Sequence, residues 1–125
     1  MSYDKFIQPR EVGIGKRTFA VSKIPALTAQ QIYATVSKSV TDNGIIGITA
    51  LPPQTVRQIL GYTALYTDDS WIAMETEAII NDTFKDNFGD MQELVIEMVK
   101  ENFGFFVSGK LLEKLVELET ETDSE

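Results

Sequence analysis

Carboxylates are the side chains with the greatest capacity for chemistry in this chain, and they crowd residues 75–90. The five are Glu75, Glu77, Asp82, Asp86 and Asp90. A calcium loop needs oxygen ligands at alternating positions, a glycine at the sharp turn and a closing glutamate, and the segment KDNFGDMQEL lacks that register. A hydrolase with paired carboxylates needs two acids facing each other across a cleft, which nothing in the sequence indicates. We therefore predict no metal site and expect Asp86 and Asp90 to be turn and cap residues.

Cysteine and histidine are both absent from the sequence. Their absence excludes disulfides, thiol catalysis and thiolate metal sites, and it removes the commonest general base. The fragment Gly15-Lys16-Arg17 lacks the first glycine of a phosphate-binding loop and the Ser/Thr after its lysine. The composition leaves carboxylate and lysine chemistry open, but no motif for either is visible, and we expect no catalytic residue, no cofactor and no enzymatic activity.

Length and charge narrow the class of protein further. A chain of 125 residues favours a single domain, and a formal net charge of -8 disfavours non-specific binding to nucleic acid. The first residues, MSYDKFIQPREVG, have no apolar core of a secretory signal, and no apolar run is long enough to cross a membrane. We expect a cytoplasmic protein with neither nucleic acid nor membrane as a partner.

The domain plan follows from composition along the chain. We expect a lead-in over residues 1–15, one globular helical domain over residues 16–118 and a disordered acidic tail over residues 119–125, whose sequence ETETDSE has no large apolar residue. Residues 1–40 are basic and the remainder is acidic. This asymmetry either is a solvated surface or lets copies meet head to tail or hold a basic partner.

The strongest structural signal is the stretch over residues 90–106, in which we expect a helix that begins at Asp90 and stops at Gly104. Its apolar residues repeat as one helical face, at Met91, Leu94, Val95, Met98, Val99 and Phe103. We expect Asp90 to cap its start, Phe88 to pack near Leu94 as a hydrophobic staple, and Gly104 to end it.

The other elements are read from shorter patterns. Alternation over residues 16–24 predicts a strand, with residues 11–14 able to pair back as a hairpin. Further helices are expected over residues 28–40, 53–63, 75–80 and 110–118. Residues 66–70 are expected as a turn, 71–73 as an edge strand, 81–89 as a loop, and 45–51 as either a short strand or a loop. The predicted fold is mainly α, a small helical domain with a short N-terminal β-hairpin or strand element (α+β).

Apolar residues near the C-terminus are the candidate partner-binding site. Five are singled out because they follow or lie beyond the expected end of the long helix: Phe105, Phe106, Leu111, Leu112 and Leu115. Large apolar groups outside a helix stripe can mark an interaction surface for an amphipathic helix. The alternative is that the two phenylalanines fill the domain's own core. For Trp71 with Tyr62 and Tyr66, which lack flanking cations, we expect packing and not a stacking platform for bases.

The order of these elements resembles tail assembly chaperones of tailed phages over about residues 16–110. The likeness lies in the basic and aromatic strand running into Ile24-Pro25-Ala26, and in the motif Asn102-Phe103-Gly104-Phe105-Phe106 after a helix with a capping acid. Residues 81–85 depart from the histidine- and proline-containing turn expected in such proteins.

This resemblance implies a non-catalytic function. Tail assembly chaperones bind the helical tape measure protein during tail morphogenesis in the host cytoplasm and are absent from the mature virion. The implied partner is the tape measure protein, and the tail tube protein and further copies of the chain are additional candidates. Two alternatives are a structural tail or head–tail connector protein retained in the virion, and a small enzyme or acidic mimic of nucleic acid.

Overall fold

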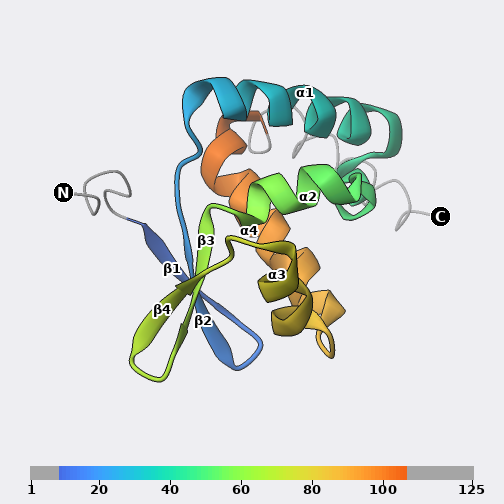
Figure 1. Cartoon of the computed structure of the whole chain (residues 1–125). Coiled ribbons are helices and arrows are strands. Elements are labelled where there is room, and N and C mark those ends of the chain that lie inside the picture. The colour runs from blue at the N-terminus through green and yellow to red at the C-terminus, as the bar shows by residue number, and fades with distance from the viewer. Residues whose placement is uncertain (1–8, 107–125) are drawn as a thin grey trace, which may run out of the picture.

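The computed structural model describes residues 9–106, which form four α-helices, a 3-10 helix and a four-stranded antiparallel sheet (Figure 1). The strands are β1 (Arg10–Ile14), β2 (Arg17–Val21), β3 (Thr63–Thr67) and β4 (Ser70–Ala73). The helices are α1 (Ala26–Asn43), η2 (Ile45–Ala50), α2 (Pro53–Leu60), α3 (Glu77–Phe84) and α4 (Phe88–Phe106).

The sheet consists of two hairpins joined side by side in the order β1-β2-β3-β4. Phe19 on β2 lies between Val12 on β1 and Leu65 on β3, which places these apolar side chains on one face. The β3–β4 turn consists of Asp68 and Asp69, whose φ angles are 51° and 63°. Two left-handed residues in a two-residue turn are typical of a tight hairpin, and aspartate tolerates this conformation better than most residues.

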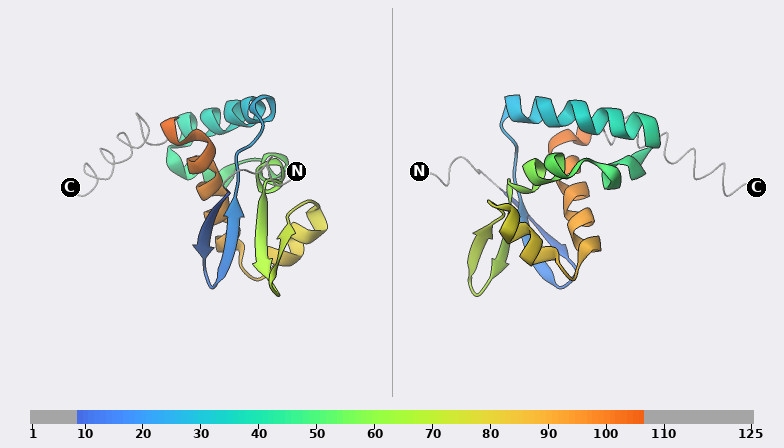
Figure 2. Two further views of the ribbon diagram at one scale, coloured as in Figure 1. Left: turned by 90° about the vertical axis from the view of Figure 1, so that its left-hand side faces the viewer. Right: turned by 45° about the vertical axis from the view of Figure 1, so that its right-hand side comes forward.

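Helix α4 packs against both the sheet and the other helices, and it contacts β1, β2, α2, α3 and η2. Figures 1 and 2 show it running from the loop after α3 up to the underside of α1. Five residues of its predicted apolar face are buried: Leu94, Val95, Met98, Val99 and Phe103. That stripe is therefore confirmed as the centre of the core, where removal of apolar area from water stabilises the fold.

The prediction of a mainly α fold is wrong, because the described residues form a small α+β structure with a complete four-stranded sheet. The N-terminal hairpin and the edge strand near Trp71 were expected and are present as β1, β2 and β4. The missing element was β3, whose five residues, TALYT, were divided between a helix end and a turn. A strand this short offers too few alternating positions to stand out from its surroundings. Strand β1 lies within residues 1–15, the stretch expected as a lead-in.

Several expected boundaries also differ. Helix α4 begins at Phe88, so Asp90 lies in its first turn and does not cap it. Phe88 is 64% exposed and does not act as a staple. The assigned helix runs to Phe106, beyond the stop expected at Gly104, but the backbone angles of Phe103 (φ -127°, ψ 33°) are non-helical and kink α4 one residue before Gly104.

The loop expected over residues 81–89 is mostly helix. Helix α3 continues to Phe84, whose buried ring stacks on Phe19 with 5.6 Å between centroids. Thr76 caps this helix by accepting a hydrogen bond from the Ile79 amide at 3.2 Å. Helix α1 starts at Ala26, before the expected cap at Thr28. Residues 45–50, expected as a strand or a loop, form the 3-10 helix η2.

Several basic residues near the N-terminus form ion pairs with acidic residues of α4. Arg10 on β1 contacts Glu97 and Glu101 on α4 at 3.0 and 2.8 Å. These hydrogen bonds, with Glu101 the stronger contributor, raise the pKa of Arg10 above its ordinary value. Arg17 lies 3.6 Å from Asp90, and Lys23 donates to the Glu101 carbonyl. The basic first strands thus meet the acidic long helix intramolecularly.

Candidate helix-binding groove

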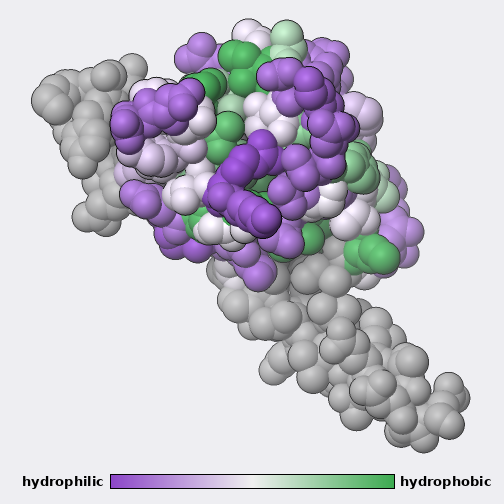
Figure 3. Space-filling view, turned by 90° about the horizontal axis from the view of Figure 1, so that it is seen from below, coloured by the Kyte–Doolittle hydropathy of each residue, from purple (hydrophilic) through white to green (hydrophobic). Residues whose placement is uncertain are grey.

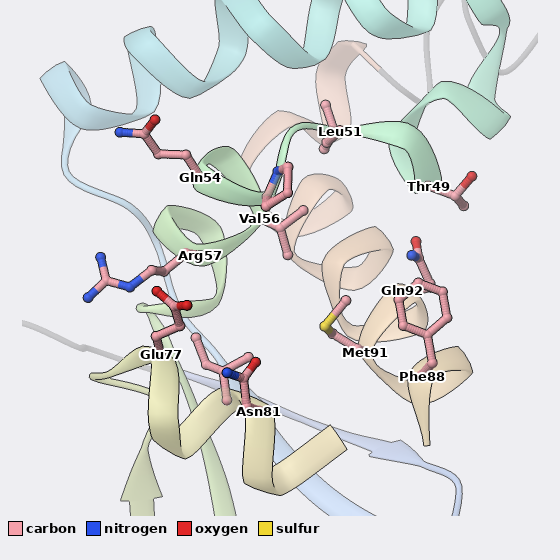
Figure 4. A pocket seen from close by; sticks show the side chains of 12 residues that line it. Thr49, Leu51, Gln54, Val56, Arg57, Glu77, Asn81, Phe88, Met91 and Gln92 are labelled. Carbon is pink, nitrogen blue, oxygen red and sulfur yellow. The ribbon is translucent and has the colours of Figure 1, made fainter. Parts of the chain in front are cut away.

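An open groove lies between α2, α3 and α4, and we call it the helix groove (Figure 4). It encloses about 580 Å³. Its lining residues are Thr49, Leu51, Pro53, Gln54, Val56, Arg57, Glu77, Ile80, Asn81, Phe88, Met91 and Gln92. The groove therefore draws on three helices and on η2, which are separated in sequence and brought together by the fold.

The floor of the helix groove is apolar. Val56 from α2 and Met91 from α4 point toward one another across it (Figure 4). Ile80 from α3 contributes a mostly buried side chain, 7% exposed, whereas Val56 and Met91 are half-buried. The unbranched side chain of methionine adapts to differently shaped partners. This floor leaves accessible apolar surface that a partner can cover.

Polar and aromatic groups lie at the two ends of the helix groove. Arg57 and Glu77 lie at one end, and Phe88 and Gln92 lie at the other (Figure 4). Neither Arg57 nor Glu77 forms an ion pair with any of residues 9–106. Both charges are therefore available to a partner. Phe88, 64% exposed, presents a large apolar group to solvent.

Local sequence fixes where the three helices around the groove begin and end. Pro53 starts α2, where proline is favoured because its fixed φ suits a first turn. Helix α2 ends after eight residues, at Gly61. The short connection over residues 85–87 separates α3 from α4 and is braced by the Asn87 amide, which donates to the Phe84 carbonyl at 3.0 Å. Two short helices and the start of a long one thus meet around a space that none of them fills.

The described structure does not test the predicted partner-binding residues. The backbones of Phe105 and Phe106 lie in the last turn of α4. Their side chains, and all of Leu111, Leu112 and Leu115, lie outside the part of the chain that is described. The sequence patterns did not predict the helix groove. Its one visible signal was Phe88, an aromatic residue that was assigned to helix packing.

The carboxylate-rich segment does not assemble a metal site in the described structure. Among residues 9–106, no three acidic side chains are grouped so that they could hold a metal ion. Asp90 instead lies against the β1–β2 turn at Gly15, where an added Cβ would come within 2.7 Å of its Oδ2. Its role is to pair with Arg17, whose guanidinium also lies 5.4 and 5.5 Å from the ring centroids of Phe19 and Phe84.

Comparisons of the chain with protein-family models, curated proteins and solved structures give no match. None of the helices within residues 9–106 has the length and apolar character needed to span a bilayer.

Proposed function

We propose that the protein is a phage tail assembly chaperone, which binds and solubilises the tape measure protein during tail morphogenesis in the host cytoplasm. The observation that carries this proposal is the helix groove, an apolar floor open to solvent between three helices. Grooves of this kind accept the apolar face of an amphipathic helix, with side chains at i, i+3, i+4 and i+7 as anchors.

The contacts that the groove offers suit a helical occupant. Val56 and Met91 would cover the apolar stripe, and Phe88 would pack over its edge. Arg57 and Glu77, of opposite sign, would orient the helix through its flanking polar residues. Because charged groups at a rim fix orientation more than they add affinity, the apolar contacts should dominate the binding free energy.

Weak individual binding is compatible with this function. An extended helical partner exposes long apolar stripes, which aggregate unless they are covered. Many copies of a small acidic protein bound along one such chain would keep it soluble, even if each groove binds weakly. The net charge of -8 on each copy would add repulsion between coated chains.

Two residues of the motif that carries the family resemblance make defined contacts within the fold. The Asn102 side chain accepts from the Ile24 amide at 2.7 Å and donates to the Ser22 carbonyl at 3.1 Å. Phe103 packs on Tyr33 of α1, with 5.4 Å between ring centroids. Asn102 and Phe103 hold α4 against α1 and the connection before it, so these two residues of the motif support the fold that shapes the groove.

The test is co-expression with the tape measure protein of the same phage, followed by co-purification. Phe88→Glu places a charge at the mouth of the helix groove and should reduce the recovered tape measure protein by about tenfold or more, as expected when an aromatic contact is replaced by a group that resists desolvation. Its melting temperature should stay near wild type because Phe88 is largely exposed.

Leu27→Glu is the matched control. Leu27 is 79% exposed on α1 and does not line the helix groove. This variant should bind like the wild type. Equal recovery of the tape measure protein with Phe88→Glu and Leu27→Glu would reject the helix groove as the binding site.

A further inference from the structure

The second open surface is the face of the sheet that does not pack on α4. A straight row of residues crosses this face because the strand register aligns Glu11 with Ala20, Ala20 with Ala64, and Ala64 with Ala73. Side chains of directly opposed residues lie on the same face of a sheet. Three of the four are alanines, whose small side chains leave a shallow depression along the middle of this face.

A hollow of about 570 Å³ follows this row, and we call it the sheet trough. The alanines form its floor, and Trp71 on β4 lines it. The Trp71 indole is 44% exposed and lies 5.0 Å from the Tyr66 ring at a tilted angle. An aromatic face beside an alanine floor can accept the aliphatic stem and the charged head of a long side chain.

The charges of the sheet trough have one sign. Its charged lining residues are Glu11 and Glu75, and no lysine or arginine lines it within the described chain. Neither carboxylate forms an ion pair among residues 9–106. Two unpaired carboxylates and an exposed indole favour a cationic side chain.

Strand β4 borders the trough and is one of the two edge strands of the sheet, and no strand within residues 9–106 pairs with its outer side. All four of its residues are exposed. The two-residue turn pairs Thr67 with Ser70, so the alternation of an antiparallel ladder turns the backbone N–H and C=O groups of Trp71 and Ala73 outward. Strand β4 contains neither the proline nor the lysine that commonly protects an edge from pairing.

We propose that the β4 edge binds an extended cationic protein segment as a fifth strand. The segment's backbone pairs with Trp71 and Ala73, and a lysine or arginine opposite Ala73 extends over the near end of the alanine row, with its charge near Glu75. Glu11, at the far end of the row, adds to the negative charge of the trough. Strand addition of this kind takes its affinity from main-chain hydrogen bonds and its specificity from the pockets for alternate side chains. This inference does not depend on the proposed function or on the helix groove.

A second copy of the chain fits the edge poorly. In the antiparallel pairing that overlaps β4 with its own copy most fully, the two-fold axis passes at Ile72. Asp69 of each copy then lies opposite Glu75 of the other, by the spacing of three residues on either side of that axis. Like charges directly opposed across a ladder are destabilising. The same acids, placed at both ends of β4, attract a basic segment.

The experiment uses the full chain and the peptide acetyl-Thr-Lys-Val-Arg-Val-Lys-Thr-amide, whose three cations alternate as in a strand. Trp71 is the single tryptophan of the chain, so its fluorescence reports directly on the trough. We expect a saturable change in fluorescence and slower amide exchange at Trp71 and Ala73. The same peptide with glutamate in place of its cations, and one methylated on alternate backbone amides, should not bind.

Two variants test separately the backbone hydrogen bonds at Ala73 and the ion pair at Glu75. Ala73→Pro removes an outward N–H without touching the β3–β4 ladder, which an edge strand tolerates, and should abolish saturable binding. Glu75→Gln should weaken binding about two- to fivefold, the effect of losing one exposed ion pair. Asp86→Asn, which removes an exposed acid that lines neither the trough nor the helix groove, should bind like the wild type.

Three results with the peptides would overturn the proposal: no saturable binding of the cationic peptide, equal binding of the acidic peptide, or unchanged binding by a folded Ala73→Pro variant. Concentration-dependent dimerisation that protects the β4 amides without peptide would also overturn it, in favour of pairing between copies.

Discussion

The helix groove and the sheet trough have nearly equal volumes, about 580 and 570 Å³, but different chemistry. The groove has an aliphatic floor, with Val56 and Met91, and charges of both signs at one end. The trough has a floor of alanines, one indole and two acids. Size alone therefore does not identify a partner. The side chains favour the apolar stripe of a helix in one place and a basic strand in the other.

The two surfaces also differ in how they are supported. Helix α4 lines the groove directly through Phe88, Met91 and Gln92. It reaches the trough only through the sheet, by contacts with β1 and β2. A change in the core under α4 should therefore affect both surfaces, whereas a change in its contacts to the first two strands should affect the trough alone. Three substitutions test the contacts of α4, and the first of them tests binding at both surfaces.

The largest effect is expected for Leu94→Ala. Leu94 is fully buried on the face of α4 that forms the core. Truncation should reduce the free energy of unfolding by about 2–5 kcal/mol, through lost burial and the cavity left behind. Denaturant unfolding measures this loss. Binding at the helix groove and binding at the sheet trough should both weaken at 37 °C. Unchanged unfolding would mean that the register of α4 is wrong.

A smaller effect is expected for Asn102→Ala. Its side chain accepts from the Ile24 amide and donates to the Ser22 and Met98 carbonyls. Loss of these partly buried bonds should cost about 1–3 kcal/mol, because the Ile24 amide is left without its partner. Amide exchange should quicken at Ile24 and remain unchanged along α2.

The comparison for that variant is Asn43→Ala, which removes a single exposed hydrogen bond to the Ser39 carbonyl. It should change stability by less than Asn102→Ala. If the two substitutions cost the same, the connection between β2 and α1 is not held by Asn102.

The smallest effect is expected for Arg10→Gln. Arg10 links β1 to α4 through Glu97 and Glu101, and these contacts are largely exposed. Exposed pairs of this kind contribute at most about 1 kcal/mol and are screened by salt. The difference in melting temperature from wild type should therefore shrink between low and high salt. A difference that is independent of salt would indicate lost packing and not lost charge.

Sequence patterns predicted the long apolar stripe well and the open surfaces poorly. Residues from Leu94 to Phe103 repeat over several turns, so one missing or misplaced residue does not hide the period. Strand β3 has only five residues and follows Gly61 and Tyr62 without a clear boundary, so its alternation was lost. Without β3, the edge at β4 and the trough across the alanines could not be foreseen.

The helix groove was unpredictable for a different reason. Its walls come from three helices, and Val56, Ile80 and Met91 each belong to an ordinary amphipathic pattern. A sequence shows that a helix has an apolar face, but not how much of that face neighbouring helices leave uncovered. The same argument applies to Phe88, which is 64% exposed because no neighbouring element covers it among the described residues.

The most direct test of the chaperone proposal combines two mass-spectrometric measurements during one infection. One identifies the proteins bound to the tape measure protein in lysates before tails are complete, and the other lists the proteins of purified virions. The account predicts this protein in the first sample, in several copies per tape measure chain, and its absence from the second. Its presence in virions, without a complex with the tape measure protein, would contradict the account and indicate a structural tail or connector protein.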